Sequence, residues 1–325
     1  MKPTALITGI AGQDGSYLAE LLLEKGYHVV GMIPRRSTPE TQTLRIEHIK
    51  YDLTLEYGDV LDLASIYRVM KLVRPDEVYH LAAQSHVGIS FTEPIHTTQV
   101  VSLGTLHMLE ATCERAPNAR FYHAASSEIF GNTPDYPITE ESRMAPASPY
   151  AAAKLQAYHL TRLYRVSKGL FAANGILFNH ESPRRGLNFV TAKVVKGALE
   201  IKYGAKQKLE LGNLDATRDW GHARDYVKAM WLILQHREPD DFIVATGHEL
   251  SVRALCRMVF DKLGLGDYQD HVVVADRFKR PFEVDRLRGD ASKARRLLGW
   301  EPTIGFEAMI DEMIADLEER FFGGR

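Results

Sequence analysis

Short apolar runs alternate with amphipathic segments through the first half of the chain. Uninterrupted apolar runs of this kind are typical of strands buried in a parallel sheet. They lie at 5–8, 28–33, 77–81, 121–125 and 170–177, with a further strand expected just before Asp59. Segments with helical periodicity lie between them, at 17–25, 63–72, 105–113 and 149–167. Strands that alternate with helices predict an α/β fold built on a doubly wound, parallel Rossmann sheet.

The pattern changes after Asn179, where loops and isolated basic residues become frequent. An apolar run at 242–245 predicts one strand that returns to the main sheet. We therefore expect a Rossmann domain over 1–178, with about 223–249 added to it. A smaller, mostly C-terminal α/β part over about 179–222 and 250–325 is expected to bind the substrate, so the chain should cross between the parts more than once.

Composition excludes several classes of protein. Of 325 residues, 45% are apolar and 25% charged, with a net charge of −2, so we expect neither a nucleic-acid partner nor binding to an anionic membrane. Cys113 and Cys256 supply no disulfide framework and no metal-ligand spacing. No apolar run approaches ~18 residues, and the chain starts without a signal-peptide pattern. A cytoplasmic protein without a metal is therefore expected.

A glycine-rich turn follows the first predicted strand. Gly9, Gly12 and Gly15 have the spacing G-x-x-G-x-x-G between that strand and a predicted helix. Glycine permits a tight turn and close backbone approach to a pyrophosphate, and a helix N-terminus offers free N–H groups to that anion. We therefore predict a dinucleotide site here, with Gln13 and Asp14 inside the turn; an ordinary turn is the alternative.

Arg35 and Arg36 follow the second strand. Sites that prefer NAD usually carry an acidic residue at this position, whereas an arginine suits the 2′-phosphate of NADP. NADP is therefore the expected cofactor, and a solvated basic loop is the alternative. Asp59 and Val60 follow the third strand. A carboxylate there can accept from the adenine amino group, or it can serve as a turn residue or a helix N-cap.

Small side chains end the fourth strand. They allow the backbone to pass close to a cofactor, although a tightly packed strand end would have the same composition. This segment consists of Leu81, Ala82, Ala83, Gln84 and Ser85.

Ser126, Tyr150 and Lys154 form the pattern that carries chemistry. Tyr150-x-x-x-Lys154 places both side chains on one face of a helix, where a nearby ammonium lowers the pKa of a phenol. Tyr150 is the expected base that takes a hydroxyl proton as hydride leaves the same carbon of a sugar. Ser126, at the end of the fifth strand, can hydrogen-bond the oxygen that becomes a carbonyl, or it can cap a helix. Together the three residues predict a short-chain dehydrogenase/reductase site.

Glu128 lies two residues beyond Ser126 and has two interpretations. It can be a solvated loop carboxylate. Alternatively, it can act after a sugar C4 has been oxidised, because a 4-ketone acidifies the C5 proton. Glu128 would then remove that proton and assist loss of the C6 hydroxyl as water.

With these residues in view, the chain resembles the GDP-mannose 4,6-dehydratases, a family of extended short-chain dehydrogenases/reductases. The resemblance extends over essentially the whole length. It includes the glycine turn, Arg35-Arg36, the segment 80–86, Tyr150 with Lys154, and the segments 218–226, 245–247 and 280–284. The run NHESPRRG at 179–186 is the most specific part of it.

The resemblance implies conversion of GDP-mannose to GDP-4-keto-6-deoxymannose by C4 oxidation, water elimination across C5 and C6, and return of the hydride to C6. It places Ser126 at the position of the family's catalytic Thr, makes Glu128 the base, and gives Tyr150 and Lys154 their usual paired role. His180 and Arg185 fall at cofactor-contact positions. The positions expected around the GDP-sugar and its diphosphate are matched by Ser85, Asn179, Val190, Lys193, Arg218, Arg280 and Glu283.

Three residues depart from the family pattern. Ser126 replaces Thr, His96 stands where a Tyr near the cofactor is expected, and His123 stands where Gln is more usual. Because His96 and His123 are expected to line the approach to the active site, the sugar could differ from mannose, and a GDP-mannoheptose is the nearest alternative. A nucleotide-sugar epimerase or 4-reductase on the same fold and a nonenzymatic NADP-sensing module stay open. The family also implies self-association to a dimer or tetramer, through an Arg-rich loop that reaches a neighbouring cofactor site.

Overall fold

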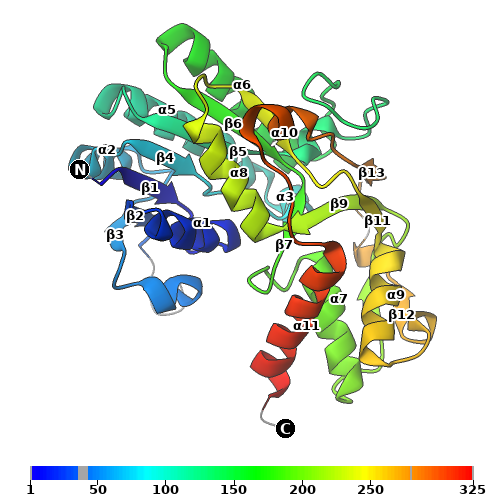
Figure 1. Cartoon of the computed structure of the whole chain (residues 1–325). Helices are drawn as coiled ribbons and strands as arrows, with labels where there is room; N and C mark the ends of the chain where they lie inside the picture. The colour runs from blue at the N-terminus through cyan, green and yellow to red at the C-terminus, as the bar shows by residue number, and fades with distance from the viewer. Residues whose placement is uncertain (1, 36–42, 279, 324–325) are drawn as a thin grey trace.

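The computed structural model describes residues 2–35, 43–278 and 280–323, and a parallel sheet forms its centre (Figure 1). Within these residues the sheet has seven strands in the order β10-β6-β5-β4-β1-β2-β3, each parallel to its neighbours. Their bounds are β1 Thr4–Thr8, β2 His28–Ile33, β3 Thr54–Tyr57, β4 Glu77–His80, β5 Arg120–Ser126, β6 Ala172–Leu177 and β10 Asp241–Val244. The strand order reverses between β1 and β4, where doubly wound sheets bind their ligands. The predicted Rossmann fold is confirmed.

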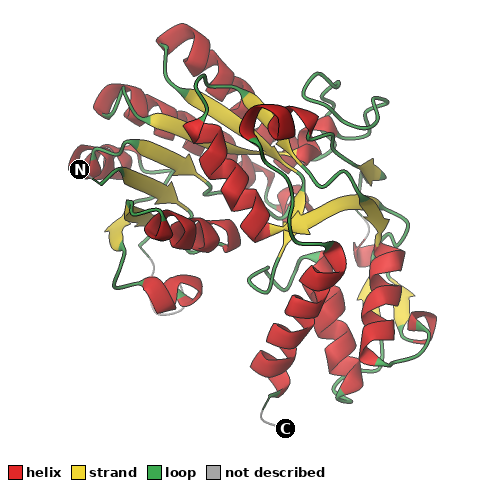
Figure 2. Ribbon diagram, viewed as in Figure 1, coloured by secondary structure: helices red, strands yellow, loops and turns green. Residues whose placement is uncertain are grey.

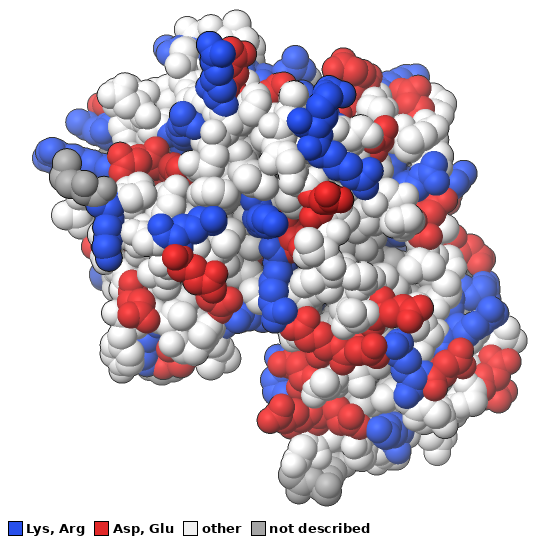
Figure 3. Space-filling model, in the orientation of Figure 1, with Lys and Arg blue, Asp and Glu red and all other residues white. Residues whose placement is uncertain are grey.

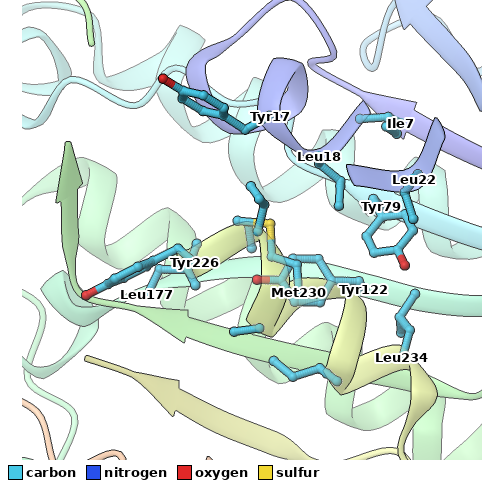
Figure 4. Packing of buried hydrophobic residues seen from close by; sticks show 14 of the residues in the cluster. Ile7, Tyr17, Leu18, Leu22, Tyr79, Tyr122, Leu177, Tyr226, Met230 and Leu234 are labelled. Atoms are coloured by element: carbon cyan, nitrogen blue, oxygen red, sulfur yellow. The ribbon is translucent and has the colours of Figure 1, made fainter. Parts of the chain in front are cut away.

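Helices cover both faces of this sheet, as Figure 2 shows. On one face, α1 (Gln13–Glu24), α8 (Ala223–Gln235) and α10 (Ser292–Leu298) pack on the strands. Leu18 of α1 and Met230 of α8 lie in the same core as Tyr122 of β5 (Figure 4). On the other face, α2 (Leu63–Val73), α5 (Gly104–Arg115) and α6 (Pro149–Lys168) share a core with Leu6 and Phe121. Apolar runs form the strands because both faces of the sheet are buried.

The sequence pattern predicts no helix or strand in the segment between β4 and α5, but the structure has three short helical pieces there. They are α3 (Val87–Thr92), α4 (Pro94–Thr98) and a π-helical turn, η3 (Gln99–Leu103), which runs directly into α5. These pieces are too short for a recognisable helical period. Helix α1 also begins earlier than its apolar period predicts, because the last glycine of the turn, Gly15, is already helical.

A second group of elements has its own sheet and its own core. Strand β9 pairs with β7, β11 and β13, and β8 pairs with β12. Helices α7, α9 and α11 pack together through Val195, Leu255 and Met313. The bounds are β7 Asn179–Glu181, α7 Val190–Lys202, β8 Leu209–Leu211, β9 Thr217–His222, β11 Glu249–Ser251, α9 Val252–Leu263, β12 Val272–Val274, β13 Arg286–Leu287 and α11 Phe306–Phe322. Short 3-10 helices lie at Leu44–Ile49, Ser127–Phe130, Tyr268–Asp270 and Asp276–Phe278.

The surface agrees with the small net charge. Lys and Arg side chains are interspersed with Asp and Glu across the face shown in Figure 3. Among the described residues, no helix is both long enough and apolar enough to cross a membrane. In the same part of the chain, no three His, Cys, Asp or Glu side chains are grouped as metal ligands.

Candidate active site

A cavity of about 1350 Å³ opens at the carboxyl end of the main sheet. Its walls come from the loops after β1, β4 and β5, from the starts of α6 and α7, and from the segments 211–218 and 277–283. Every candidate site residue of the sequence analysis lines this cavity except Arg36, which lies outside the described residues. The fold therefore brings together residues that are far apart in the sequence.

The glycine turn has no room for side chains. A Cβ on Gly15 would lie 2.3 Å from the carbonyl oxygen of Gly9, and one on Gly9 would lie 2.9 Å from the Ala82 nitrogen. Gly9 also has φ +73°, a left-handed conformation that favours glycine. The turn brings bare backbone and the N-terminus of α1 to the cavity wall, which fits the pyrophosphate of a dinucleotide.

Asp14 and His180 form a part-buried ion pair beside this turn. His180 Nε2 lies 2.8 Å from Asp14 Oδ2, and His180 Nδ1 lies 2.8 Å from the Phe178 carbonyl oxygen. Burial alone would raise the pKa of Asp14, but the charge and hydrogen bonds of its neighbours, His180 foremost, lower it to about 2. Burial alone would lower the pKa of His180, but the Asp14 carboxylate outweighs it and the pKa is raised.

Arg35 and Asp59 line the same cavity beyond the second and third strands. The Arg35 guanidinium lies 4.9 Å from the centre of the Tyr57 ring, a cation–π distance. Asp59 Oδ1 accepts from the Leu61 N–H at 2.9 Å, so Asp59 is a turn residue as well as part of the wall. The N-cap of α2 is Asp62.

The end of β4 is fixed against the glycine turn by Thr8. Its hydroxyl oxygen accepts from the N–H groups of Leu81 and Ala82, at 3.2 Å each, and lies 2.8 Å from Nδ1 of His80. Burial lowers the pKa of His80 to about 3, so the ring is neutral and can accept from the Thr8 hydroxyl. The backbone at Leu81 and Ala82 is therefore held at the cavity by part-buried hydrogen bonds to Thr8.

Tyr150 and Lys154 lie in the first turns of α6, which Ser148 caps and Pro149 starts. Lys154 Nζ donates to the Ala124 carbonyl oxygen at 2.5 Å and lies 5.9 Å from the Tyr150 ring centre. Burial lowers the pKa of Lys154 to about 8. Burial raises the pKa of Tyr150 to about 12, so the net shift is opposite to the lowering expected from the nearby ammonium group.

Ser126 is the last residue of β5, Glu128 follows two residues later, and both line the cavity. Ser126 Oγ accepts from the Glu128 N–H at 3.3 Å and so caps a short 3-10 helix. A hydrogen bond between the Ser126 and Tyr150 side chains favours the ionised form of Tyr150 and opposes the rise in its pKa that burial causes. Glu128 is only 7% exposed, which argues against a solvated loop carboxylate. Its Oε1 lies 3.6 Å from Nη1 of Arg280.

Arg218 and Arg280 bring positive charge to the same cavity. Arg218 is buried, and its Nη2 lies 3.5 Å from Oε1 of Glu283; Arg280 Nη1 lies 3.6 Å from that oxygen. Two guanidinium groups beside two carboxylates make a site whose charges can rearrange around a bound anion.

His123 is one residue that the structure does not bring to the cavity. It is 1% exposed, and its Nδ1 lies 2.8 Å from Oδ1 of Asn174. The expectation that His123 lines the approach to the active site is therefore wrong. His96 does line the cavity, on α4.

Several wall residues had no role assigned from the sequence. His86 Nε2 lies 3.3 Å from the Asn188 carbonyl oxygen, and this contact joins the loop after β4 to the segment before α7. Arg45 Nε donates to the Arg184 carbonyl oxygen at 2.9 Å. Motif spacing carries no signal for such contacts because their partners are more than 100 residues away.

Comparison of the sequence with known proteins gives a family that agrees with the residues found in the cavity. A family model described as GDP-mannose 4,6 dehydratase matches residues 6–313. The chain belongs to the GDP-mannose 4,6-dehydratase family. A relative named GDP-mannose 4,6 dehydratase 1, from Arabidopsis thaliana, is 50% identical over 330 residues, which cover 98% of this chain and 90% of that protein. The predicted enzyme class, a hydro-lyase of the extended short-chain dehydrogenase/reductase type, is confirmed.

Solved structures extend the likeness to other nucleotide-sugar enzymes. The dTDP-glucose 4,6-dehydratase DesIV of Streptomyces venezuelae, solved with NAD and TYD, has a TM-score of 0.84 and 25% identity; 99% of this chain and 98% of that chain are covered. RMD of Pseudomonas aeruginosa, solved with NADPH, has a TM-score of 0.81 and 25% identity; 98% of this chain and 100% of that chain are covered. The chain therefore shares its fold with proteins that were solved with nicotinamide cofactors.

Proposed function

We propose that the protein converts GDP-mannose to GDP-4-keto-6-deoxymannose and water, with NADP as the recycled cofactor. The observation that carries this proposal is the meeting of Ser126, Glu128, Tyr150 and Lys154 in one cavity with the arginine pair Arg218 and Arg280. The first four groups suit oxidation and elimination, and the arginines suit a diphosphate.

Tyr150 acts as the base for the C4 hydroxyl, and Ser126 holds the same oxygen as it becomes a carbonyl. A nicotinamide cofactor held by the glycine turn and the 81–85 segment would supply the hydride acceptor for C4 and the hydride donor for C6. Burial raises the pKa of Tyr150 to about 12, so the phenol must first give its own proton to solvent; the hydrogen bond with Ser126 favours the phenolate, which then accepts the C4 hydroxyl proton. Lys154, fixed by its hydrogen bond to Ala124, keeps a cation beside this proton transfer.

Glu128 acts in the elimination. Once C4 is a ketone, the C5–H bond is acidic, and the Glu128 carboxylate takes that proton. The C5–H electron pair forms the C5=C6 bond while the C6–O bond breaks, and the proton leaves with the hydroxyl as water. After hydride reaches C6, a proton returns to C5. The net change is loss of one water, without an external oxidant or reductant.

Isotope transfer tests this reaction directly. GDP-mannose deuterated at C4 is incubated with the protein and NADP in ordinary water, and the product is examined by mass spectrometry and NMR. Deuterium at C6 and a mass lower by one water are expected. Product without that water loss would favour an epimerase or 4-reductase. No product from folded protein that binds NADPH would favour the sensing module.

NADP is preferred to NAD in this proposal because the chain after β2 carries Arg35 and no acidic residue at that point. An arginine can bind a 2′-phosphate through charge-assisted hydrogen bonds. NADPH is expected to bind at least about tenfold more tightly than NADH. Equal dissociation constants would remove the preference.

We also propose that the protein works in the cytoplasm as a dimer or tetramer, as its family resemblance implies. Light scattering coupled to size-exclusion chromatography measures the mass in solution, and a monomeric mass would contradict this part of the proposal.

A further inference from the structure

Strand β7 lies between the cofactor turn and helix α7, and it contacts both with successive side chains. His180 reaches Asp14 in the glycine turn, and Glu181 reaches Thr191 in the first turn of α7. Successive side chains of a strand point to opposite faces. One strand therefore has a polar contact to each of the two groups of elements that wall the cavity.

The contact to the cofactor turn is a charged one. His180 Nδ1 faces a carbonyl oxygen and Nε2 faces the Asp14 carboxylate, so protonation of the ring lets both nitrogens donate, and the Asp14 carboxylate raises the pKa of His180. Gln13 adds a second connection, because its side-chain nitrogen donates to the His180 carbonyl oxygen and its side-chain oxygen accepts from the Ser182 hydroxyl at 2.8 Å. The His180 ring also stacks on Tyr226, at 4.6 Å between ring centres. This end of the strand is held in one position relative to the turn.

The contact to α7 is fully buried. Glu181 is 1% exposed and Thr191 is 0% exposed, and the Thr191 hydroxyl donates to Glu181 Oε2 at 2.5 Å. The same oxygen pairs with Arg185 Nε at 3.0 Å. Thr191 lies between Val190 and Lys193, the α7 residues that line the cavity where the nucleotide sugar is proposed to bind. A movement of β7 must therefore move the start of α7 or break a buried hydrogen bond.

We propose that β7 couples the two binding sites, so that NADP and the guanine nucleotide each raise the affinity for the other. This inference rests on the proposed function. A bound cofactor restrains the glycine turn further, Asp14 carries this restraint to His180 and the strand, and Glu181 carries it to Thr191 in the first turn of α7. The second ligand meets a site that is already ordered and loses less conformational freedom on binding. By linkage the effect is reciprocal.

Calorimetric titration of the full chain tests the coupling. The dissociation constant for GDP is measured without NADPH and with saturating NADPH, whose own affinity is titrated separately for each variant. In the wild-type protein, NADPH should lower the dissociation constant for GDP by roughly fivefold or more. In Asp14→Asn and in Thr191→Val the ratio should fall to about one. Thr191→Val is the informative variant, because it leaves Asp14, His180 and the Glu181–Arg185 pair in place.

Glu20→Gln is the matched control. Glu20 lies on the same helix as Asp14 and pairs with Arg184 at 2.6 Å, so it also joins α1 to the segment after β7, but it does not line the cavity. This variant should keep the wild-type ratio. A ratio of one in the wild-type protein, or a ratio retained in Thr191→Val, would overturn the inference while leaving the proposed function intact. A protein that binds neither GDP nor NADPH would instead overturn the proposed function, and the inference with it.

Discussion

Nη1 of Arg280 lies 3.6 Å from Oε1 of Glu128, within ion-pair range but beyond a hydrogen bond. The same nitrogen is buried, and no group among the described residues accepts a hydrogen bond from it. A buried guanidinium nitrogen in this state gains from a new acceptor, since an unpaired buried donor is unfavourable. An anionic ligand in the cavity would supply that acceptor and would weaken the ion pair between Arg280 and Glu128.

Arg280→Gln should therefore weaken substrate binding. The KM for GDP-mannose is expected to rise by about tenfold to a hundredfold, because a charge-assisted hydrogen bond to the diphosphate is lost. Steady-state kinetics measure the KM, and fluorescence titration with NADPH provides the control, since cofactor binding should change little. An unchanged KM would show that Arg280 does not contact the substrate.

Glu128→Gln should separate binding from elimination. The amide keeps the shape of the side chain but cannot accept the C5 proton, so product formation is expected to fall by about a hundredfold to ten-thousandfold. The affinities for GDP and NADPH should stay near the wild-type values. Product release at the wild-type rate would remove Glu128 from its proposed role as the base.

Lys154→Met should stabilise the protein while it removes activity. Burial lowers the pKa of Lys154 from 10.5 to about 8, so the folded protein carries an unfavourable charge below pH 8. That destabilisation is complete at pH 7 and disappears as the pH rises from about 8 to 10.5. We expect a gain of about 1–3 kcal/mol in the free energy of unfolding at pH 7, after allowing for the lost bond to Ala124.

Urea unfolding at pH 7 and at pH 10 measures this difference. Lys168→Met, at the exposed end of the same helix, is the control and should change stability little at either pH. A Lys154→Met protein that is less stable than wild type at pH 7 would contradict the prediction.

The Asp14–His180 pair should make stability depend on pH in a defined window. The folded-state pKa of Asp14 is lowered to about 2, so its contribution is present above its ordinary value of 3.8 and is lost toward pH 2. The pKa of His180 is raised, so its contribution is complete below 6.5 and is lost as the pH rises through the folded value. Asp14→Asn should therefore be most destabilising, by about 1–3 kcal/mol, between pH 4 and pH 6.5. Thermal melts across pH 3–9 test this, and a difference that keeps growing above pH 8 would contradict it.

Gly15→Ala should prevent a normal cofactor turn. The added Cβ would lie 2.3 Å from the Gly9 oxygen and 2.5 Å from the Ile10 Cα, both backbone atoms that cannot move aside cheaply. Loss of NADPH binding is expected, with a lower melting temperature. Gly305→Ala is the control, because its Cβ would meet open space, and it should bind NADPH normally.

The sequence sufficed for the main sheet and for many of the residues that line the cavity, although Arg45 and His86 were not assigned a role. Buried parallel strands are uninterrupted apolar runs, and α6 ends at Gly169, whose φ of +65° is a helix stop that sequence patterns show well. The strands β7, β11 and β13 have two or three residues each, too few to show a period.

Contacts between distant residues were beyond sequence patterns for a different reason. Asp14 and His180 are 166 residues apart, and their meeting depends on the path of the whole chain. The rise in the pKa of Tyr150 was also missed, because the tyrosine–lysine spacing shows the nearby cation but not the depth of burial. His123 was misplaced because its side chain points to Asn174 on the neighbouring strand instead of to the cavity.

Strand β10 has a consequence for how this enzyme can change its substrate. It completes the edge of the main sheet beside β6, although elements that pack around the nucleotide-sugar wall lie on both sides of it in the chain, α7 before it and α9 after it. No single cut in the polypeptide separates the two ligand-binding regions. The residues proposed to contact the nucleotide sugar, such as Val190, Arg218 and Arg280, lie on both sides of β10 in the chain, so a change of base or sugar preference involves several separate stretches of the sequence.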